Sequence, residues 1–237
     1  MKIMTFNTQH CLNYVTRKID FDIMANAINK FNPDVVGLQE MRDKGSHFEY
    51  DAQTEILSSL TGMENFYFAK AIDFVGKYED SIEPYGNSVL TKNKIVSKET
   101  IIIPDPDPKT GTKYYETRCL LKIKLDNGLT IMVVHVGLND DEAQNAVKTI
   151  IDNLETEKCV LMGDFNLRPD NPILSPLREK LVDSAIAIDG EGLTYPSDAP
   201  RVKIDYIFTT PDLKIKSAFV PELVSSDHRP LLVEIDF

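Results

Sequence analysis

The sequence predicts an α/β fold in which mixed β-sheets are covered by helices, and three features of the chain support this. Apolar residues at helical spacing alternate with strand-like runs in the first part of the chain. Hairpin-like strands follow in the middle, with the turn signal Asp126-Asn127-Gly128 between two of them. Polar side chains repeatedly stand where apolar strands end, and layered α/β folds assemble their sites at such positions.

The first third of the chain contains two predicted helices, each with a stop signal. Asn32-Pro33 ends the first helix, because proline cannot continue it, and Gly62 ends the second. A buried strand between the two helices delivers Glu40 at its far end. In chain order the ranges are a strand at 2–6, a helix at 20–31, a strand at 34–39 and a helix at 51–60.

The remainder is mainly strand, with one clear helix at 140–155. The apolar residues of this helix form one stripe, and Asn139 with Glu142 resembles a capping box. Strands are predicted at 65–71, 86–91, 95–103, 118–125, 129–136, 159–162, 203–209, 213–220 and 231–236.

Bulk composition is that of a globular protein, with 237 residues of which 42% are hydrophobic. Linker and low-complexity segments are not evident, so we expect a single domain over residues 1–237. With 26 Lys and Arg against 37 Asp and Glu, the net charge is −11. Such a surface disfavours broad tracking along nucleic acid, although a bound divalent cation can reverse the local field.

The three cysteines, Cys11, Cys119 and Cys159, fit no zinc pattern and are expected to be buried free thiols. A reducing cytoplasm suits them. The N-terminal MKIMTFN does not resemble a signal peptide, and no run approaches the ~18 apolar residues of a membrane span. We therefore expect a cytoplasmic protein without membrane contact, and a monomer by default.

Asp164 and Asn166 follow the strand at 159–162, and strand alternation points both to one side, with Phe165 opposite. Gly163 permits close backbone approach. Because Asp and Asn are also common turn residues, an ordinary turn has about even odds on this segment alone.

Asp205 is a carboxylate inside an apolar strand, and a buried carboxylate needs a partner. His228 is the candidate partner through Nδ1. The alternatives are that Asp205 lies on an exposed face with Lys203, and that Asp227-His228 is only a polar connection. Glu40 suits a hard cation, but in isolation a solvated strand end is the better explanation.

In order along the chain, these segments resemble those of the endonuclease/exonuclease/phosphatase superfamily. The matching segments are Thr5-Phe6-Asn7, Leu38-Gln39-Glu40, Tyr85-Gly86-Asn87-Ser88, Glu116-Thr117-Arg118, Val134-His135, Gly163-Asp164-Phe165-Asn166, Ile204-Asp205-Tyr206 and Ser226-Asp227-His228-Arg229-Pro230. Each motif is weak alone, but the ordered set covers almost the whole chain. The resemblance implies a four-layer α/β sandwich, with two packed mixed sheets flanked by helices.

The resemblance also implies a Mg²⁺-dependent phosphate-ester hydrolase, with Mn²⁺ as a substitute. Glu40 resembles the principal metal ligand, with Asn7 and Asp227 close to the metal. Asp205 orients His228, and either His228 or Asp164 activates water. Further positions contact the phosphate, with Arg118 open to a structural role: Asn166, His135, Tyr85 and Arg118.

This sequence departs from the family pattern at Val136-Gly137-Leu138-Asn139, which lacks the second histidine or aspartate often found after His135. It also has no room for large recognition insertions. A small phosphorylated substrate is the favoured partner. A nuclease is the alternative, in which residues 109–118 would contact the nucleic-acid backbone. The other interpretation of this segment is a solvated loop. A noncatalytic binding module ranks last. The loops at 73–86 and 104–116 are expected to shape the mouth of the pocket.

Overall fold

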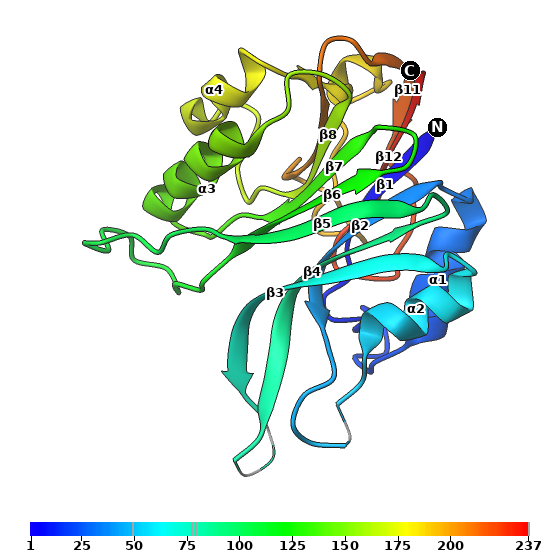
Figure 1. Ribbon diagram of the computed structural model, residues 1–237, viewed down its shortest axis with the longest axis vertical. Helices are drawn as coiled ribbons and strands as arrows, with labels where there is room; N and C mark the ends of the chain where they lie inside the picture. Colours follow the sequence, from blue (N-terminus) through cyan, green and yellow to red (C-terminus); the bar gives the residue numbers. More distant parts are fainter. Residues whose placement is uncertain (49, 77, 79, 237) are drawn as a thin grey trace.

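The computed structural model describes residues 1–48, 50–76, 78 and 80–236. Within these residues the strands form two sheets of six strands each, which pack face to face. Helices cover both outer faces, α1 and α2 on one side and α3 and α4 on the other (Figure 1). The result is the four-layer α/β sandwich expected from the sequence.

The first sheet has the strand order β11-β12-β1-β2-β4-β3. β1 runs parallel to β2 and antiparallel to β12, so the first and last strands of the chain are neighbours. The strands are β1 (Lys2–Asn7), β2 (Val35–Arg42), β3 (Asn65–Val75), β4 (Ile82–Thr91), β11 (Lys214–Phe219) and β12 (Leu231–Asp236).

The second sheet has the strand order β5-β6-β7-β8-β10-β9. β7 and β8 are parallel and place His135 opposite Asp164, while β10 runs antiparallel to β8 and places Asp205 opposite the same aspartate. The strands are β5 (Ile95–Ile102), β6 (Cys119–Leu125), β7 (Thr130–His135), β8 (Cys159–Asp164), β9 (Val182–Asp183) and β10 (Asp205–Thr209).

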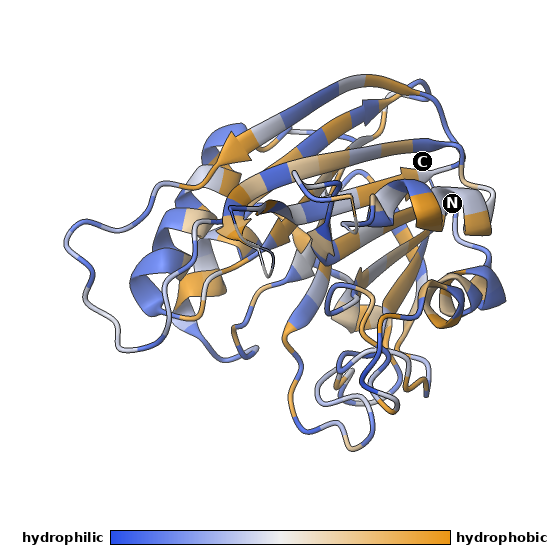
Figure 2. Cartoon of the chain, turned by 90° about the horizontal axis from the view of Figure 1, so that it is seen from below, coloured by the Kyte–Doolittle hydropathy of each residue, from blue (hydrophilic) through white to orange (hydrophobic). Residues whose placement is uncertain are grey.

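Three apolar cores separate the four layers. Between the sheets, Ile3 and Val35 pack against Val133 and Met162. Outside the first sheet, Met4 and other residues pack under α1 (Phe21–Phe31) and α2 (Gln53–Thr61). The third core lies between the second sheet and α3 (Asp140–Asn153) with α4 (Ser175–Arg178). Strands that are covered on both faces bury successive side chains. Figure 2 shows the apolar and polar stretches along the chain.

The helix ends follow the signals in the sequence. Asp20 accepts a hydrogen bond from the backbone N–H of Ile23 at the start of α1, and Asn32 ends that helix in the left-handed conformation. The predicted capping box of Asn139 and Glu142 is confirmed at the start of α3. Gly37 lets the sheets approach closely, because a Cβ there would lie 2.8 Å from the Met162 sulfur.

One prediction for an irregular segment was wrong. Residues 73–86 are not a loop: β3 extends to Val75 and β4 begins at Ile82, so they form a projecting hairpin, although Lys77 and Glu79 lie outside the described residues. Because this stretch mixes polar and apolar residues, its alternation was too weak to predict strands. The sequence also gave no signal for η1 (Pro172–Leu174), α4, β9 or η2 (Ser184–Ala187), which are too short to show a period.

Two arms project from the body of the sandwich (Figure 1). One is the β3–β4 hairpin with the neighbouring segment 43–52, which together we call the hairpin arm. The other is the connection between β5 and β6, residues 103–118, which contains the loop predicted at 104–116. Among the described residues, no helix is both long and apolar enough to cross a membrane.

Candidate active site

The candidate site lies where strand ends of the two sheets meet. β1, β2, β7 and β8 bring Asn7, Glu40, His135 and Asp164 to this edge at or near their carboxyl ends. Antiparallel neighbours contribute from their first residues, so Asp205 begins β10 opposite Asp164. The loop before β12 adds Asp227 and His228, and β4 and the residue before β6 add Tyr85 and Arg118. All ten residues predicted for the site therefore gather in one region.

Asn7 joins the two sheets. Its side-chain amide donates to Glu40 Oε1 and to Asp164 Oδ2, both at 3.0 Å, and the residue is fully buried. Its oxygen accepts from the backbone N–H of Gln9 at 3.0 Å. In this orientation Asn7 fixes two carboxylates with its donor side and keeps its oxygen turned away from Glu40.

Glu40 stands in a strained part of β2. Its φ of 60° is left-handed, and the pairing of β2 with β4 shifts register between Leu38 and Met41. This bulge turns the Glu40 carboxylate toward Asn7 instead of leaving it in the strand's regular alternation. Strained backbone of this kind is concentrated at functional sites, and Asn166, at φ 52°, is a second example here.

Among the described residues, no Lys or Arg side chain forms an ion pair with the Glu40 carboxylate. Burial raises its pKa, the Asn7 hydrogen bond opposes that rise, the Asp227 carboxylate adds to it, and the positive charges of His228 and Arg118 lower it. Within the described chain, the group at ion-pair distance is His10 Nδ1, at 4.0 Å. That imidazole is neutral at pH 7, because burial and the Arg42 guanidinium lower its pKa to about 4.

His228 is held between two aspartates. Its Nδ1 is 2.8 Å from Asp205 Oδ2, and its Nε2 is 3.6 Å from Asp164 Oδ2. Burial alone would lower its pKa, but Asp205 and Asp164 outweigh that effect and raise it to about 10. The imidazole is therefore positively charged at neutral pH. The predicted Asp205–His228 pair is present, and the alternative of an exposed Asp205 beside Lys203 was wrong, since both are buried.

Asp164 is the centre of the network. Its Oδ1 accepts from the backbone N–H of Asn166, while its Oδ2 faces Asn7, His228 and, at 3.5 Å, His135. Burial raises its pKa, and the positive charge of His228 partly offsets that. As predicted, Phe165 points the other way, into the core against Tyr206 and Phe208.

His135 is oriented by Arg118. The guanidinium donates to His135 Nδ1 at 2.9 Å, so Nδ1 is the acceptor and Nε2 carries the proton. Burial and the positive charge of Arg118 lower the pKa of His135 well below its usual value, which keeps the ring neutral. Its Nε2–H is thus aimed at Asp164, and the Asn166 amide beside it donates to the Val136 carbonyl at 2.9 Å.

Arg118 is itself fixed by Glu116, at 2.6 Å, and lies 6.0 Å from the centre of the Tyr85 ring. Burial and the Glu40 carboxylate raise the pKa of the Tyr85 phenol well above its usual value. Sequence reasoning did not assign Glu116 or His10 to the site. The proximity of Glu116 to Arg118, and of His10 to Asn7, was the available signal.

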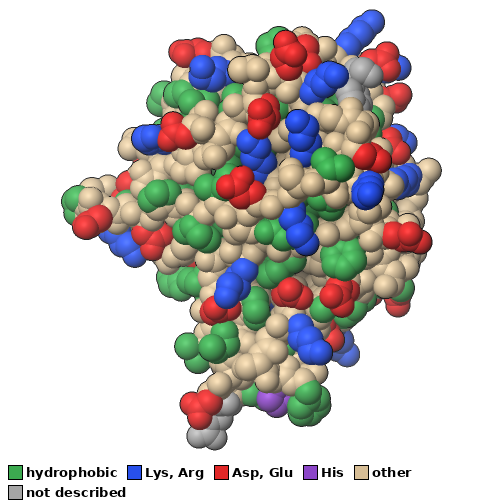
Figure 3. All heavy atoms as spheres, viewed as in Figure 1, with side chains coloured by type: hydrophobic (Ala, Val, Ile, Leu, Met, Phe, Trp, Pro, Cys, Tyr) green, Lys and Arg blue, Asp and Glu red, His purple; other side chains and the backbone are tan. Residues whose placement is uncertain are grey.

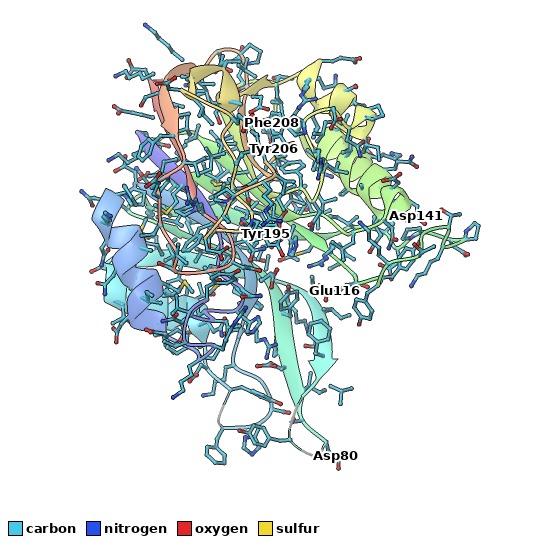
Figure 4. All side chains as sticks on the ribbon, turned by 180° about the vertical axis from the view of Figure 1, so that it is seen from behind. Asp80, Glu116, Asp141, Tyr195, Tyr206 and Phe208 are labelled. Carbon is cyan, nitrogen blue, oxygen red and sulfur yellow. The ribbon has the colours of Figure 1, made fainter. Side chains whose placement is uncertain are left out.

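Tyr195 was also not predicted for the site. Its ring is 4.9 Å from the ring of His228. Figure 4 labels Tyr195 and Glu116 near the middle of the molecule, whereas Asp80 marks the far tip of the hairpin arm.

A divalent cation would fit the first-sheet part of this site. Glu40 and Asp227 offer carboxylate oxygens, which hard cations prefer, and no cationic side chain of the described residues forms an ion pair with Glu40. Asp164, Asp205 and His228 also place ligand atoms within 4.8 Å of one another. There the imidazolium already compensates one of the two negative charges, and a cation would have to displace a bonded partner.

The model of the Endonuclease/Exonuclease/phosphatase family matches residues 4–228. The chain belongs to this family. The match begins at Met4 and ends at His228, so it contains all ten residues of this endonuclease/exonuclease/phosphatase protein's candidate site. Comparison with curated protein sequences gives no match.

Solved structures share its fold. The chain is similar to an endonuclease/exonuclease/phosphatase from Beutenbergia cavernae DSM 12333, with a TM-score of 0.83, 21% identity, and coverage of 100% of this chain and 71% of that one. It is similar to a mannosyl-6-phosphatase from Bacteroides thetaiotaomicron VPI-5482, with a TM-score of 0.74, 17% identity and full coverage of both chains. Sphingomyelinase C from Streptomyces griseocarneus matches with a TM-score of 0.71, 17% identity and 98% coverage of both.

Proposed function

We propose that this family member is a Mg²⁺-dependent hydrolase of phosphate esters that acts on a small phosphorylated molecule. The observation that carries the proposal is the bridge made by Asn7, which bonds Glu40 and Asp164 through one amide nitrogen while Asp164 faces both His135 and His228. One phosphoryl group can therefore contact the cation-binding carboxylate and the histidines together.

In the proposed reaction Asp164 is the base. Its raised pKa suits it to take a proton from water at neutral pH, whereas His228 is already protonated and cannot accept one. The water oxygen forms a bond to phosphorus as the bond to the leaving oxygen breaks, and the leaving oxygen takes a proton from solvent. A divalent cation held by Glu40 and Asp227 would supply positive charge to the phosphoryl oxygens.

The other side chains stabilise the negative charge that develops on the phosphoryl oxygens. His228 offers a charged Nε2–H, His135 a neutral Nε2–H, and Asn166 an amide N–H. Asp205 and Arg118 act through the two imidazoles, since each bonds the Nδ1 of one ring and so orients its Nε2. Such preorganised donors contribute about 3–4 kcal/mol each in comparable sites.

The surface supports a small substrate over a nucleic acid. The net charge is −11, and Lys and Arg side chains are interspersed with Asp and Glu on the face shown in Figure 3. A polyanionic backbone gains little from such a surface. The thiols of Cys11, Cys119 and Cys159 are free, which suits the cytoplasm that we propose as the protein's location.

A substrate screen tests the proposal. The purified chain is assayed with Mg²⁺, with Mn²⁺ and with a chelator against a dye phosphodiester, a dye phosphomonoester, abasic DNA and plasmid DNA. We expect cation-dependent hydrolysis of a small ester, and loss of that hydrolysis in Glu40→Gln but not in the exposed control Glu99→Gln. Hydrolysis that survives chelation would contradict the metal role, and nicking of plasmid at lower enzyme concentration would establish a nuclease instead.

A further inference from the structure

Glu142 is a buried carboxylate that the proposed mechanism does not use. It belongs to the first turn of α3, and only 6% of the residue is exposed. In the part of the chain that the structure describes, no lysine, arginine or histidine forms an ion pair with it. A buried carboxylate without a cationic partner depends on hydrogen bonds, so its partners indicate which segments it holds in place.

Two hydrogen bonds of Glu142 serve the start of α3, and a third reaches outside the helix. Its Oε2 accepts from the backbone N–H of Asn139 at 3.1 Å and from the Asn139 side-chain amide at 2.8 Å. These two bonds belong to the capping box. Its Oε1 instead accepts from the backbone N–H of Glu116 at 3.3 Å. Helix capping therefore explains one oxygen of the carboxylate and leaves the bond to Glu116 unexplained.

The carboxylate lies between the two segments that carry Arg118 and His135. Glu116 is two residues before Arg118, and Gly137 is two residues after His135. A Cβ on Gly137 would lie 2.5 Å from the Glu142 carboxyl carbon, so the carboxylate packs directly on the Gly137 backbone. The two segments meet in the site, where the Arg118 guanidinium donates to His135 Nδ1 at 2.9 Å. One buried carboxylate thus contacts both of the segments that must be aligned for this bond.

We propose that Glu142 is a positioning residue that keeps Arg118 aligned with His135 Nδ1. In the proposed function, on which this role rests, the neutral His135 offers its Nε2–H to a phosphoryl oxygen. Arg118 enforces that tautomer, because its N–H occupies the lone pair of Nδ1. Without the bond to Glu142, the backbone at Glu116 loses a fixed point and the guanidinium can move away from Nδ1. The proton can then reside on either ring nitrogen.

The neighbouring Asp141 provides a matched control, because it holds another part of the same β5–β6 connection. Its Oδ2 accepts from the backbone N–H of Thr110 and from the Tyr115 hydroxyl, both at 2.7 Å. Figure 4 labels Asp141 at the start of α3 and Glu116 nearer the middle of the molecule. A variant of Asp141 therefore loosens the connection from the same helix turn and leaves the bond between Glu142 and Glu116 in place.

The test separates helix capping from the alignment of Arg118. Glu142→Gln keeps one oxygen, which can still bond Asn139, and turns its amide donor toward the N–H of Glu116. Glu142→Ala removes the bonds to both. With Mg²⁺ and either bis(p-nitrophenyl) phosphate or p-nitrophenyl phosphate, we expect kcat to fall about tenfold in both variants and KM to stay unchanged. The loss of one buried hydrogen bond allows an effect of this size. Asp141→Asn should keep the wild-type kcat.

Imidazole nitrogen chemical shifts measured by NMR give a readout that does not depend on activity. Nε2 of His135 should carry the proton in the wild type and in Asp141→Asn, whereas Glu142→Gln should show both tautomers. An unchanged tautomer or a wild-type kcat in Glu142→Gln would overturn the proposed role, and a loss confined to Glu142→Ala would reduce Glu142 to a helix cap. If the wild-type chain hydrolyses no phosphate ester, the proposed function itself is refuted, and the NMR comparison still decides whether Glu142 aligns Arg118.

Discussion

The two sheets deliver different kinds of side chain to the same site. At the end of the first sheet, Glu40 lies with Asp227 nearby, and the neighbouring His10 is neutral. At the end of the second sheet, Asp164 and Asp205 enclose the positively charged His228. Among the described residues, no Lys or Arg forms an ion pair with Glu40, whereas His228 compensates one of the two negative charges of Asp164 and Asp205. The first side therefore suits the cation that we propose, and the second side suits the proton transfer that we propose.

The largest effect on activity should come from a substitution in the Asp164–Asp205–His228 cluster on the second side. Asp205→Asn removes the charge that orients His228, and loss of an orienting aspartate lowers kcat by up to about 10⁴-fold in a well-studied histidine system. We expect a loss of about 10²–10⁴-fold, with the Kd for Mg²⁺ unchanged in calorimetric titration. Asp126→Asn, in an exposed turn, is the control. An increase in the Kd for Mg²⁺ would instead place the cation at the Asp164–Asp205–His228 cluster. The second side, and not the first, would then bind the cation.

A substitution of Glu40 on the first side should weaken cation binding and leave the protonation of His228 unchanged. For Glu40→Gln we expect an increase in the Kd for Mg²⁺ of about 10–100-fold. His228 should remain protonated at pH 7, because the aspartates that raise its pKa to about 10 are intact. Imidazole nitrogen chemical shifts measured by NMR report this directly. A deprotonated His228 in this variant would show that the Glu40 charge is also needed to keep the imidazole protonated.

Asn7 links the two sides, because its side-chain amide donates to Glu40 on the first side and to Asp164 on the second. Asn7→Ala removes donors from two buried carboxylates and should lower the free energy of unfolding by about 1–3 kcal/mol. It should also affect both the Kd for Mg²⁺ and kcat. Urea unfolding measures the first effect, with Asn26→Ala on the exposed face of α1 as control. A variant that changes only one of the two functional readouts would assign Asn7 to one side alone.

The smallest expected effect concerns the reactivity of the three cysteine thiols, which reports how well each side of the site is closed to solvent. Cys11 lies near the first-sheet site, and Cys119 and Cys159 lie in the second sheet; burial raises the pKa of each thiol to about 12. We expect all three to be unreactive toward a thiol reagent at pH 8 and to react on unfolding in guanidinium chloride. Selective labelling of Cys11 in the native protein, detected by mass spectrometry, would show that the first side opens on its own.

Much of this site could be predicted from the sequence, for physical reasons that differ between residues. Asp205 was paired with His228 because a carboxylate inside an apolar strand needs a partner. Asp164 and Asn166 were placed on one side by strand alternation. The bulge that reorients Glu40 has no local signature, and the orientation of Asn7 depends on contacts between distant segments. His10 was missed because its role depends on its distance from Glu40.

Some parts of the fold could likewise be predicted from the sequence and others could not. Strong periodicity predicted α1, α3 and the central strands, whereas residues 73–86, the outer part of the β3–β4 hairpin, were predicted as a loop. The hollow of about 550 Å³ that Phe74 and Asp51 help to line could not be predicted, because it depends on how distant segments lie in space. The single-domain organisation, monomeric state and cytoplasmic location stay predictions.

The position of β12 couples the two sides of the site. This strand lies between β11 and β1, and Asp227 and His228 lie in the loop just before it, so their places beside Glu40 and Asp164 depend on the pairing of β12 with β1. Local opening of this one strand pair would therefore remove a proposed cation ligand and the imidazole from the site together.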